Sequence, residues 1–210
     1  NKESNFKKIF YKLKNYAIKN SATVALLVRK NSIEKKIIIK KKINVKLFKR
    51  RNALKIVNEN LPKSIARIST TGMLSRELNE INVQKKSEQN TFMCVGGMGH
   101  AISVASGIAL EKKKKVVCLD GDGAVAMHMG ALATSSKNNN LIHIVFNNKS
   151  HDSVGGQPTA TNNVSYFKLA KILGYKHCYF ARNKKTLIKS IKLSIKTKKS
   201  TFIEILCSKG

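Results

Sequence analysis

Short apolar runs alternate with helical patterns from about Ala66 to the end of the chain. Six runs rich in β-branched or aromatic residues predict strands at 66–70, 91–95, 115–120, 141–147, 175–180 and 201–207. The segments between them predict helices near 73–82, 99–111, 124–137, 164–173 and 184–196. Several of the strands are continuously apolar, which is typical of a parallel sheet covered on both faces. The pattern therefore predicts a doubly wound α/β domain, in which ligands bind at the carboxyl ends of the strands.

The first 50 residues do not share this alternation. Residues 5–19 predict a helix, and residues 22–33, ATVALLVRKNSI, predict a strand that a lysine-rich stretch without glycine or proline follows. This segment is either a strand with a solvated linker or the end of a second α/β domain. With the second interpretation, the chain divides into a domain remnant at 1–30, a basic linker at 31–50 and a main domain at 51–210.

Composition narrows the classes of partner. The chain carries 41 basic and 11 acidic residues, a formal charge of +30, which first suggests a nucleic acid. The lysines are spread along the chain, however, and the aromatic residues, 6% in all, do not alternate with basic ones as in RNA-stacking surfaces. We therefore expect solvated basic faces and no specific nucleic-acid partner, with non-specific binding to polyanions at low salt.

The length of the apolar runs and the spacing of the cysteines indicate where in the cell the protein is expected. No apolar run approaches the roughly 18 residues of a membrane span, so no membrane partner is expected. The cysteines are widely spaced without a CxxC pair, which favours buried reduced thiols over disulfides or a metal cluster. They are Cys94, Cys118, Cys178 and Cys207. These features predict a cytoplasmic protein.

An acidic turn follows one of the buried strands. The run KVVCLD ends at Asp120, and Gly121, Asp122, Gly123 and a predicted helix come next. Glycine on both sides of Asp122 exposes main-chain amides beside the positive end of the helix, an arrangement that attracts phosphate. A carboxylate there repels phosphate unless a cation lies between them, so Asp122 implies a hard divalent metal such as Mg²⁺. An ordinary capped loop is the alternative, and Asp120 is assigned a supporting role.

A second strand ends in amides at the matching position. LIHIVFNN ends with Asn147 and Asn148, and residues 124–146 leave room for one helix and one parallel strand after the acidic turn. Asp122 and Asn148 would therefore emerge side by side at one edge of the sheet. A carboxylate and an amide oxygen are suitable ligands for Mg²⁺.

GDG, followed one helix and one strand later by NN, resembles the cofactor motif of the thiamine diphosphate-dependent enzymes. The resemblance implies that the main domain has the thiamine diphosphate-binding fold, as the diphosphate-binding domain. It also implies that Asp122, Asn148 and the main-chain carbonyl of Ser150 hold Mg²⁺, which bridges the diphosphate of thiamine diphosphate.

Further cofactor contacts are assigned by the same resemblance. GGMGHAISVASGIAL is similar to the segment before the motif, where a large apolar residue between glycines wedges the cofactor into a bent shape. Met98 takes that position, with an ordinary core methionine as the alternative, and its N–H would meet a ring nitrogen. The carbonyl of Gly96 would accept from the aminopyrimidine amine. The other predicted contacts are Thr71, Gly72, Gly121 and the amides of Gly123 and Ala124.

Four segments narrow the resemblance. ISTTGMLSREL, GGMGHA, DGDGAVAMHMGALAT and NNKSHDSVGGQPT, within roughly residues 66–160, resemble the phosphonopyruvate decarboxylase family, with sulfopyruvate decarboxylases as the nearest neighbours. The resemblance implies decarboxylation of a small anionic 2-oxo acid, 3-phosphonopyruvate, to phosphonoacetaldehyde and CO₂. In such a reaction the cofactor accepts the electrons that CO₂ leaves behind.

The predicted catalytic residues are His151, His128 and Arg76. A phosphonate needs donors, which favours Arg76 and His100, and His151 is placed to donate a proton at the reacting centre. The alternatives are a solvated helix position for Arg76, a merely polar loop position for His151 and core packing for His128. His143, within a strand, is assigned a structural role.

Thiamine enzymes also need a glutamate that comes from a pyrimidine-binding domain, usually on a neighbouring subunit. Residues 1–30 look like the C-terminal remnant of such a domain, and Glu3, Glu34 and Glu59 lie in no matching motif. We therefore expect a pyrimidine-domain partner in a homo- or hetero-oligomer, without which the chain does not catalyse. The alternatives are a sulfopyruvate decarboxylase β subunit, a truncated non-catalytic module that binds thiamine diphosphate and, least favoured, a polyanion-binding accessory protein.

Overall fold

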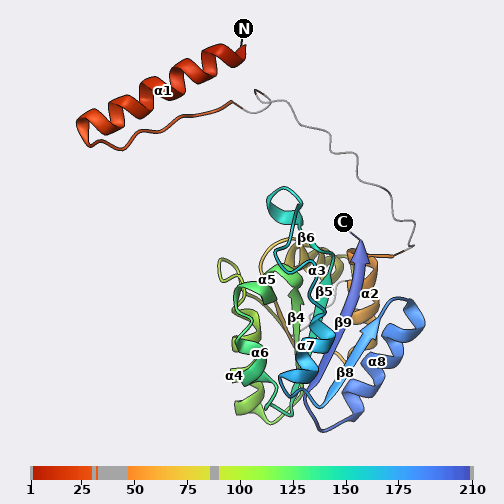
Figure 1. Ribbon diagram of the computed structural model, residues 1–210. Coiled ribbons are helices and arrows are strands. Elements are labelled where there is room, and N and C mark those ends of the chain that lie inside the picture. The colour runs from red at the N-terminus through yellow and green to blue at the C-terminus, as the bar shows by residue number, and fades with distance from the viewer. Residues whose placement is uncertain (1, 30–31, 33–46, 86–89, 209–210) are drawn as a thin grey trace. The chain divides into compact units, whose positions relative to one another are not determined.

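Figure 1 shows the computed structural model, which describes residues 2–29, 32, 47–85 and 90–208. The chain divides into two units, Asn1–Asn44 and Val45–Gly210. In the first unit, α1 spans Lys2–Asn20, which confirms the helix predicted at 5–19.

The strand predicted at 22–33 is wrong for the part that the structure describes. Residues 22–29 form no strand, and the described part of this unit contains no second strand with which they could pair. An isolated strand leaves its main-chain groups without partners and is not stable. Residues 30, 31 and 33 of that prediction lie outside the described residues. The assignment of residues 1–30 to a pyrimidine-binding domain stays a prediction.

A parallel sheet forms the centre of the second unit (Figure 1). Its strands are β1 (Phe48–Lys49), β2 (Ala66–Ser69), β3 (Thr91–Met93), β4 (Val116–Gly121), β5 (Leu141–Asn147), β8 (His177–Ala181) and β9 (Thr201–Ser208). The order is β1-β9-β5-β4-β2-β3, β8 also pairs with β9, and every pairing is parallel. The doubly wound parallel sheet is thus confirmed, with strand ends at most two residues from those predicted.

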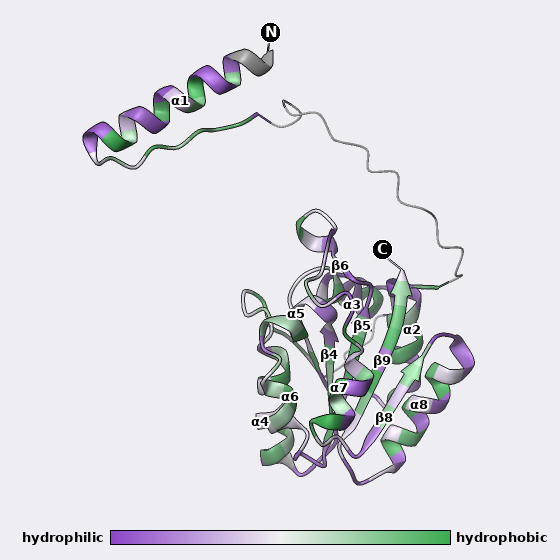
Figure 2. Cartoon of the chain, in the orientation of Figure 1, coloured by the Kyte–Doolittle hydropathy of each residue, from purple (hydrophilic) through white to green (hydrophobic). Residues whose placement is uncertain are grey.

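Helices cover both faces of this sheet. Successive strand residues point to opposite faces, so β4 sends Val117 and Leu119 into one core and Val116 and Cys118 into another. Figure 2 shows β9 as largely green, in keeping with a strand buried on both faces. The first core packs against α2 (Arg50–Asn60), α3 (Met73–Gln84) and α8 (Lys184–Lys196). The opposite face packs against α4 (Ala101–Lys112), α6 (Ala131–Ser135) and α7 (Tyr166–Ile172).

The helix predicted at 124–137 is wrong, because two short helices take its place. They are α5 (Asp122–Met127) and α6, and they are separated at His128, whose φ of −130° and ψ of 49° are not helical. The ring of His128 packs so closely on Gly99 that a Cβ at Gly99 would lie 2.5 Å from its Cδ2 atom. This tertiary contact, which no local pattern reveals, accompanies the break. The helices predicted near 73–82, 99–111, 164–173 and 184–196 are confirmed, whereas the helix at Arg50–Asn60, α2, was not predicted.

The boundary predicted between linker and main domain at residue 50 is too late. Phe48 and Lys49 form β1, which pairs with the end of β9, and Arg50 begins α2. Ala53, Leu54 and Val57 of this helix are fully buried, so α2 is part of the core. The rest of the predicted linker lies mostly outside the described residues.

The loop after β5 forms a small hairpin that the sequence did not predict. β6 (Ser150–His151) pairs antiparallel with β7 (Gln157–Pro158), and a 3₁₀ turn, η1 (Asp152–Val154), lies between them. The hairpin places Ser150 and His151 near the carboxyl ends of β4 and β5, where both line the cavity described below. Among the described residues, no helix has both the length and the apolar character needed to cross a membrane.

Candidate cofactor and metal site

A cavity of about 60 Å³ opens at the carboxyl ends of β4 and β5. The walls of the cavity are the turn at residues 121–123, here called the GDG turn, the start of α3, Arg50 of α2 and the hairpin after β5. Many of the predicted site residues line it: Thr71, Met98, Gly121, Asp122, Gly123, Ala124, Asn148, Ser150 and His151. The structure therefore gathers these residues at one place, and their individual roles stay predictions.

Asp122 is the first residue of α5 and is 3% exposed. Its Oδ2 atom accepts a hydrogen bond of 3.0 Å from the hydroxyl of Thr159. Burial raises the pKa of Asp122 above its usual value, and hydrogen bonds from Thr159 and the Gly123 amide offset this only in part. A buried carboxylate of this kind is stabilised in its ionised form by a nearby cation.

Asn148 and Ser150 line the same cavity as Asp122. The side-chain amide of Asn148 donates to Asp152 Oδ2 at 2.8 Å, and its oxygen accepts from the Ser150 N–H at 3.1 Å. Between them, Lys149 has a φ of 57°, in the left-handed region, which tightens the turn. The two predicted ligands are therefore held together by one short turn.

Two buried hydroxyls in the cavity test whether these residues fit the predicted group. Ser150 Oγ and Thr70 Oγ1 both belong to lining residues and have no hydrogen-bond partner in the described part of the chain. Unpaired buried hydroxyls are costly unless a ligand pairs with them. With the Asp122 carboxylate and the Asn148 amide, they make an oxygen-rich donor set of the kind that Mg²⁺ prefers. The residues thus fit Mg²⁺ and a diphosphate.

Gly123 is the point where three elements meet. A Cβ at this position would lie 2.8 Å from Cε1 of His151 and 3.4 Å from Cε of Met98. The absence of a side chain at Gly123 therefore lets the His151 ring and the Met98 side chain approach the GDG turn from two sides. Of the three predicted catalytic residues, His151 alone lines the cavity.

The remaining predicted residues lie elsewhere. His128 packs against His100, with ring centroids 4.2 Å apart and the rings tilted by 45°, and does not line the cavity. Arg76 is exposed on α3, where its Nη1 atom lies 3.9 Å from the sulfur of Met73. Gly72 and Gly96 are not among the lining residues either, although both have a positive φ that shapes the adjacent loops. The structure does not bring His128 or Arg76 to the cavity of this chain.

Sequence patterns missed a buried ion-pair group beside the predicted ligands. Arg50 donates through Nε and Nη2 to the carboxylate of Glu77 at 3.0 and 2.9 Å, and through Nη1 to Asp152 at 2.5 Å. Arg50 and Glu77 are 5% and 7% exposed. Asp152 could have been noticed because it lies in the NNKSHDSVGGQPT segment, whereas Arg50 stands in a basic run without any distinguishing signal.

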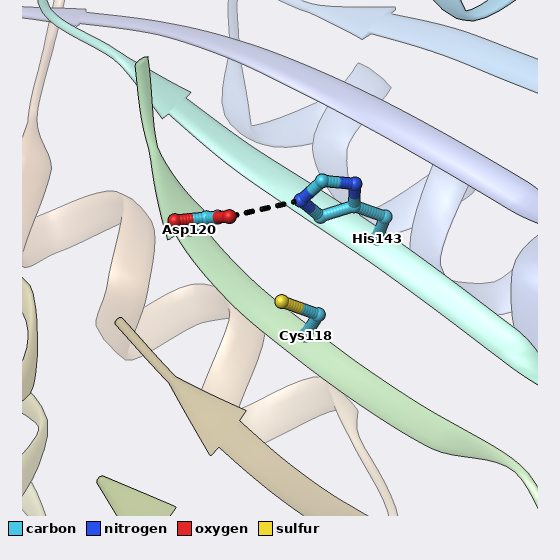
Figure 3. A group of neighbouring side chains, drawn as sticks. All are labelled: Cys118, Asp120 and His143. Carbon is cyan, nitrogen blue, oxygen red and sulfur yellow. Dashed lines mark hydrogen bonds and ion pairs between the residues drawn. The ribbon is translucent and has the colours of Figure 1, made fainter. Parts of the chain in front are cut away.

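A second buried polar group lies next to the GDG turn, and Figure 3 shows its residues Cys118, Asp120 and His143. Asp120 accepts from the Gly121 N–H at 3.0 Å, and its other oxygen lies 3.3 Å from Nε2 of His143. The hydroxyl of Tyr175 lies 3.4 Å from the other ring nitrogen of His143. Burial raises the pKa of the neighbouring Cys118 thiol well above its usual value. The structural roles of Asp120 and His143 stay predictions.

Comparisons with known proteins agree with this geometry. Residues 70–205 match the family of the thiamine pyrophosphate enzyme C-terminal TPP binding domain. The chain belongs to this family, and the predicted fold and resemblance are confirmed.

Two relatives come from Streptomyces species and a third from Methanocaldococcus jannaschii. The phosphonopyruvate decarboxylase of Streptomyces viridochromogenes is 34% identical over 160 residues, which cover 75% of this chain and 39% of that protein. The phosphonopyruvate decarboxylase of Streptomyces hygroscopicus is 39% identical over 126 residues, 59% of this chain and 30% of that protein. The sulfopyruvate decarboxylase subunit beta of Methanocaldococcus jannaschii is 33% identical over 129 residues, 60% of this chain and 66% of that subunit.

Solved structures share the fold. A benzoylformate decarboxylase from Polynucleobacter necessarius superposes with a TM-score of 0.64 at 17% identity, over 85% of this chain and 36% of its own. A 4-hydroxybenzoylformate decarboxylase from Rhodococcus jostii gives a TM-score of 0.64 at 14% identity, over 87% of this chain and 37% of its own. The chain thus spans less than half of the Streptomyces relatives and of these structures.

Proposed function

We propose that this chain is the diphosphate- and Mg²⁺-binding half of a thiamine diphosphate-dependent decarboxylase that acts on a small anionic 2-oxo acid. The observation that carries the proposal is the convergence of Asp122, Asn148 and Ser150, from the ends of neighbouring strands, on one cavity with unpaired buried hydroxyls. The proposed substrate is 3-phosphonopyruvate, which gives phosphonoacetaldehyde and CO₂. Identities of 34% and 39% to two phosphonopyruvate decarboxylases support this choice.

The residues of this chain have distinct parts in the proposal. Asp122, the side-chain oxygen of Asn148 and the carbonyl of Ser150 would hold Mg²⁺. The amides of Gly123 and Ala124 would face the diphosphate, and Met98 would support the bent cofactor. When bound, thiamine diphosphate supplies the chemistry that accepts the electron pair released with CO₂.

His151 is the proposed proton donor at the reacting carbon. It lines the cavity beside Gly123 and Met98, whereas His128 and Arg76 do not line it. Of the residues predicted as catalytic, His151 is therefore the one that this chain positions by itself. Arg76 remains a candidate for the anionic tail of the substrate only if another part of the complete protein lies against α3.

The proposal includes a second half that supplies the activating glutamate. No glutamate within the described residues lines the cavity. Several are engaged elsewhere: Glu77 binds Arg50, and Glu204 accepts from the Asn147 amide and the Phe167 N–H. A relative named as a subunit beta supports an arrangement with separate chains. Decarboxylation of sulfopyruvate by such an assembly is the second candidate, since 66% of that subunit is matched.

A thermal-melt experiment tests the cofactor site first. The chain is melted with and without thiamine diphosphate plus Mg²⁺, and Asp122→Ala serves as the control. A ligand that binds only the folded chain adds RT ln(1 + [L]/Kd), about 2.7 kcal/mol at a hundredfold excess over Kd. A Mg²⁺-dependent shift that Asp122→Ala abolishes supports the site; an equal shift in the variant contradicts it.

Turnover then tests the substrate and the need for a partner. CO₂ release is measured from 3-phosphonopyruvate and from sulfopyruvate, with the chain alone and with a candidate pyrimidine-domain chain. The proposal expects turnover only with the second chain. Full turnover by the purified chain alone would overturn the part of the proposal that concerns a partner.

A further inference from the structure

Arg50 is a buried cation held between two carboxylates. Its guanidinium forms a two-pronged contact with Glu77 of α3, at 3.0 and 2.9 Å, and a third hydrogen bond of 2.5 Å with Asp152 of η1. These contacts join α2, α3 and the loop after β5 at the wall of the cavity. Burying a charge costs free energy even when it is paired, and apolar residues often replace such groups without loss of stability. Stability alone therefore does not explain this buried ion-pair group, which points to a functional role.

Asp152 connects this ion-pair group to Asn148. Its Oδ2 atom accepts from Arg50 Nη1 and also from Asn148 Nδ2, the latter at 2.8 Å. A carboxylate accepts hydrogen bonds and does not donate them, so it selects the nitrogen end of the Asn148 amide. The oxygen end is left for the Ser150 N–H, 3.1 Å away, and for a cation in the cavity.

An asparagine amide has two ends of nearly equal shape, and only the oxygen end can bind a metal. If the amide turned over, it would present N–H groups to the cation, which repel it. The side chain of Arg50 holds Asp152 in place, and Asp152 determines which end of Asn148 faces the cation. All three residues line the same cavity.

We propose that Arg50 and Asp152 are positioning residues that fix the side-chain oxygen of Asn148 towards the metal. This inference rests on the proposed function, because it concerns the same Mg²⁺ site. Residues that orient metal ligands usually change metal affinity by roughly 10- to 100-fold when they are replaced. The same size of effect is expected here.

Manganese binding tests the proposal without measuring turnover. Mn²⁺ replaces Mg²⁺ as a probe, and free Mn²⁺ is followed by electron paramagnetic resonance in the presence of thiamine diphosphate and the full chain. Arg50→Gln and Asp152→Asn are each expected to weaken Mn²⁺ binding by about 10- to 100-fold. Asp152→Asn removes the negative charge of the acceptor that Arg50 and Asn148 share, so both hydrogen bonds to residue 152 weaken with little change in shape.

The chain offers a matched control on the same helix. Arg51 follows Arg50 directly and forms an exposed ion pair with Glu80. Arg51→Gln removes the same charge from the chain but leaves Asp152 and Asn148 untouched, so Mn²⁺ binding should stay within about twofold of the original chain. An equal loss in Arg51→Gln and Arg50→Gln would show a general effect of charge and overturn the proposal.

A double-mutant cycle separates positioning from direct contact with the diphosphate. In an Asn148→Ala background, Arg50→Gln should add little further loss, because there is no amide left to orient. A full additional loss in that background would mean that Arg50 acts independently of Asn148, which overturns the proposal. Melting curves without ligand check that each variant is folded, and if Arg50→Gln does not fold, Asp152→Asn takes its place in the cycle.

Failure of this inference can be distinguished from failure of the proposed function. Asp122→Asn and Asn148→Ala test the metal site itself. If both lose Mn²⁺ binding while Arg50→Gln and Asp152→Asn keep it, only the positioning role is wrong. If none of the variants differs from the original chain, or if the original chain binds no Mn²⁺, the metal site and the inference fail together.

Discussion

The hydroxyl of Tyr166 donates a hydrogen bond of 2.8 Å to the main-chain carbonyl of Asp122. This contact joins α7 directly to the GDG turn, and Tyr166 is fully buried. Thr159 binds the same residue through its side chain, with the hydroxyl 3.0 Å from Asp122 Oδ2. The predicted metal ligand is therefore fixed through both its main chain and its side chain by the segment that follows β7.

Tyr166→Phe removes one of these two attachments. The Asp122 carbonyl then loses a buried partner, which costs about 1–3 kcal/mol of stability. Urea denaturation without ligand measures this loss, and the same titration with thiamine diphosphate and Mg²⁺ should show a smaller ligand effect than in the original chain. Tyr179→Phe is the control, since no hydrogen bond of the Tyr179 hydroxyl is found among the described residues. Equal losses in the two variants would contradict the prediction.

Asp122→Asn should stabilise the chain in the absence of metal. Burial raises the pKa of Asp122 above its usual value of 3.8, so ionisation of this carboxylate favours the unfolded chain. The cost is therefore fully present at pH 7 and disappears as the pH falls through the raised pKa towards 3.8. The variant should show a higher free energy of unfolding at pH 7, a smaller gain near pH 4 and no response to Mg²⁺.

Glu80→Gln provides the comparison for that experiment. Glu80 is an exposed carboxylate that pairs with Arg51, and its removal should change stability by less than about 1 kcal/mol with no effect on the response to Mg²⁺. A metal-free Asp122→Asn chain that is less stable than the original at pH 7 would mean that the hydrogen bonds to Asp122 outweigh its burial.

The elements that the sequence predicts correctly are those that a pattern of neighbouring residues determines. β5 and α8 occupy the predicted residues because a buried strand is a continuous apolar run and a packed helix has a regular apolar face. That Asp122 and Asn148 line one cavity could be predicted because residue type and spacing along the chain suffice once the strands are known to be parallel. Because β4 and β5 are adjacent and parallel, their carboxyl ends lie at the same edge of the sheet.

The features missed depend on contacts between distant segments. Arg50 and Asp152 are 102 positions apart, and a buried arginine in a basic run looks the same as a solvated one. The break between α5 and α6 coincides with the packing of His128 on Gly99, which no helical pattern records. The strand predicted at 22–33 is the opposite kind of error, in which a local pattern predicts an element that does not form. β-Branched residues favour a strand, but they do not supply a neighbouring strand to pair with.

The cysteines should be unreactive in the folded chain. Burial raises the pKa of Cys178 to about 11 and that of Cys207 to about 12. Because the thiolate is the reactive form, their alkylation by iodoacetamide at pH 8 should be slower than that of a free cysteine by roughly a hundredfold. Intact-mass measurements should show slow modification of the native chain and modification of all four cysteines in denaturant. Rapid alkylation of either residue in the native chain would contradict this.

Gly123→Ala and Gly107→Ala are the same chemical change but should alter the stability of the chain in opposite directions. A methyl group at Gly123 would lie 2.8 Å from Cε1 and 2.9 Å from Nδ1 of His151, so the ring must move away from the GDG turn. The ring is the outer end of a half-buried side chain and can move, so the loss of stability should be about 1 kcal/mol or less, while the response to thiamine diphosphate and Mg²⁺ weakens.

At Gly107, inside α4, no atom beyond the neighbouring residues and the nearby backbone of the helix lies within 4 Å of the added methyl, so alanine should gain roughly 0.5–1 kcal/mol from its better helix propensity. Urea denaturation gives both stabilities, and melts with the ligands give both responses. Because the two substitutions are chemically identical, opposite effects would locate the requirement for glycine in the contact with His151. A Gly123→Ala chain that keeps the full ligand response would show that His151 can move without loss of the site, and its proposed role as proton donor would then lose its structural support.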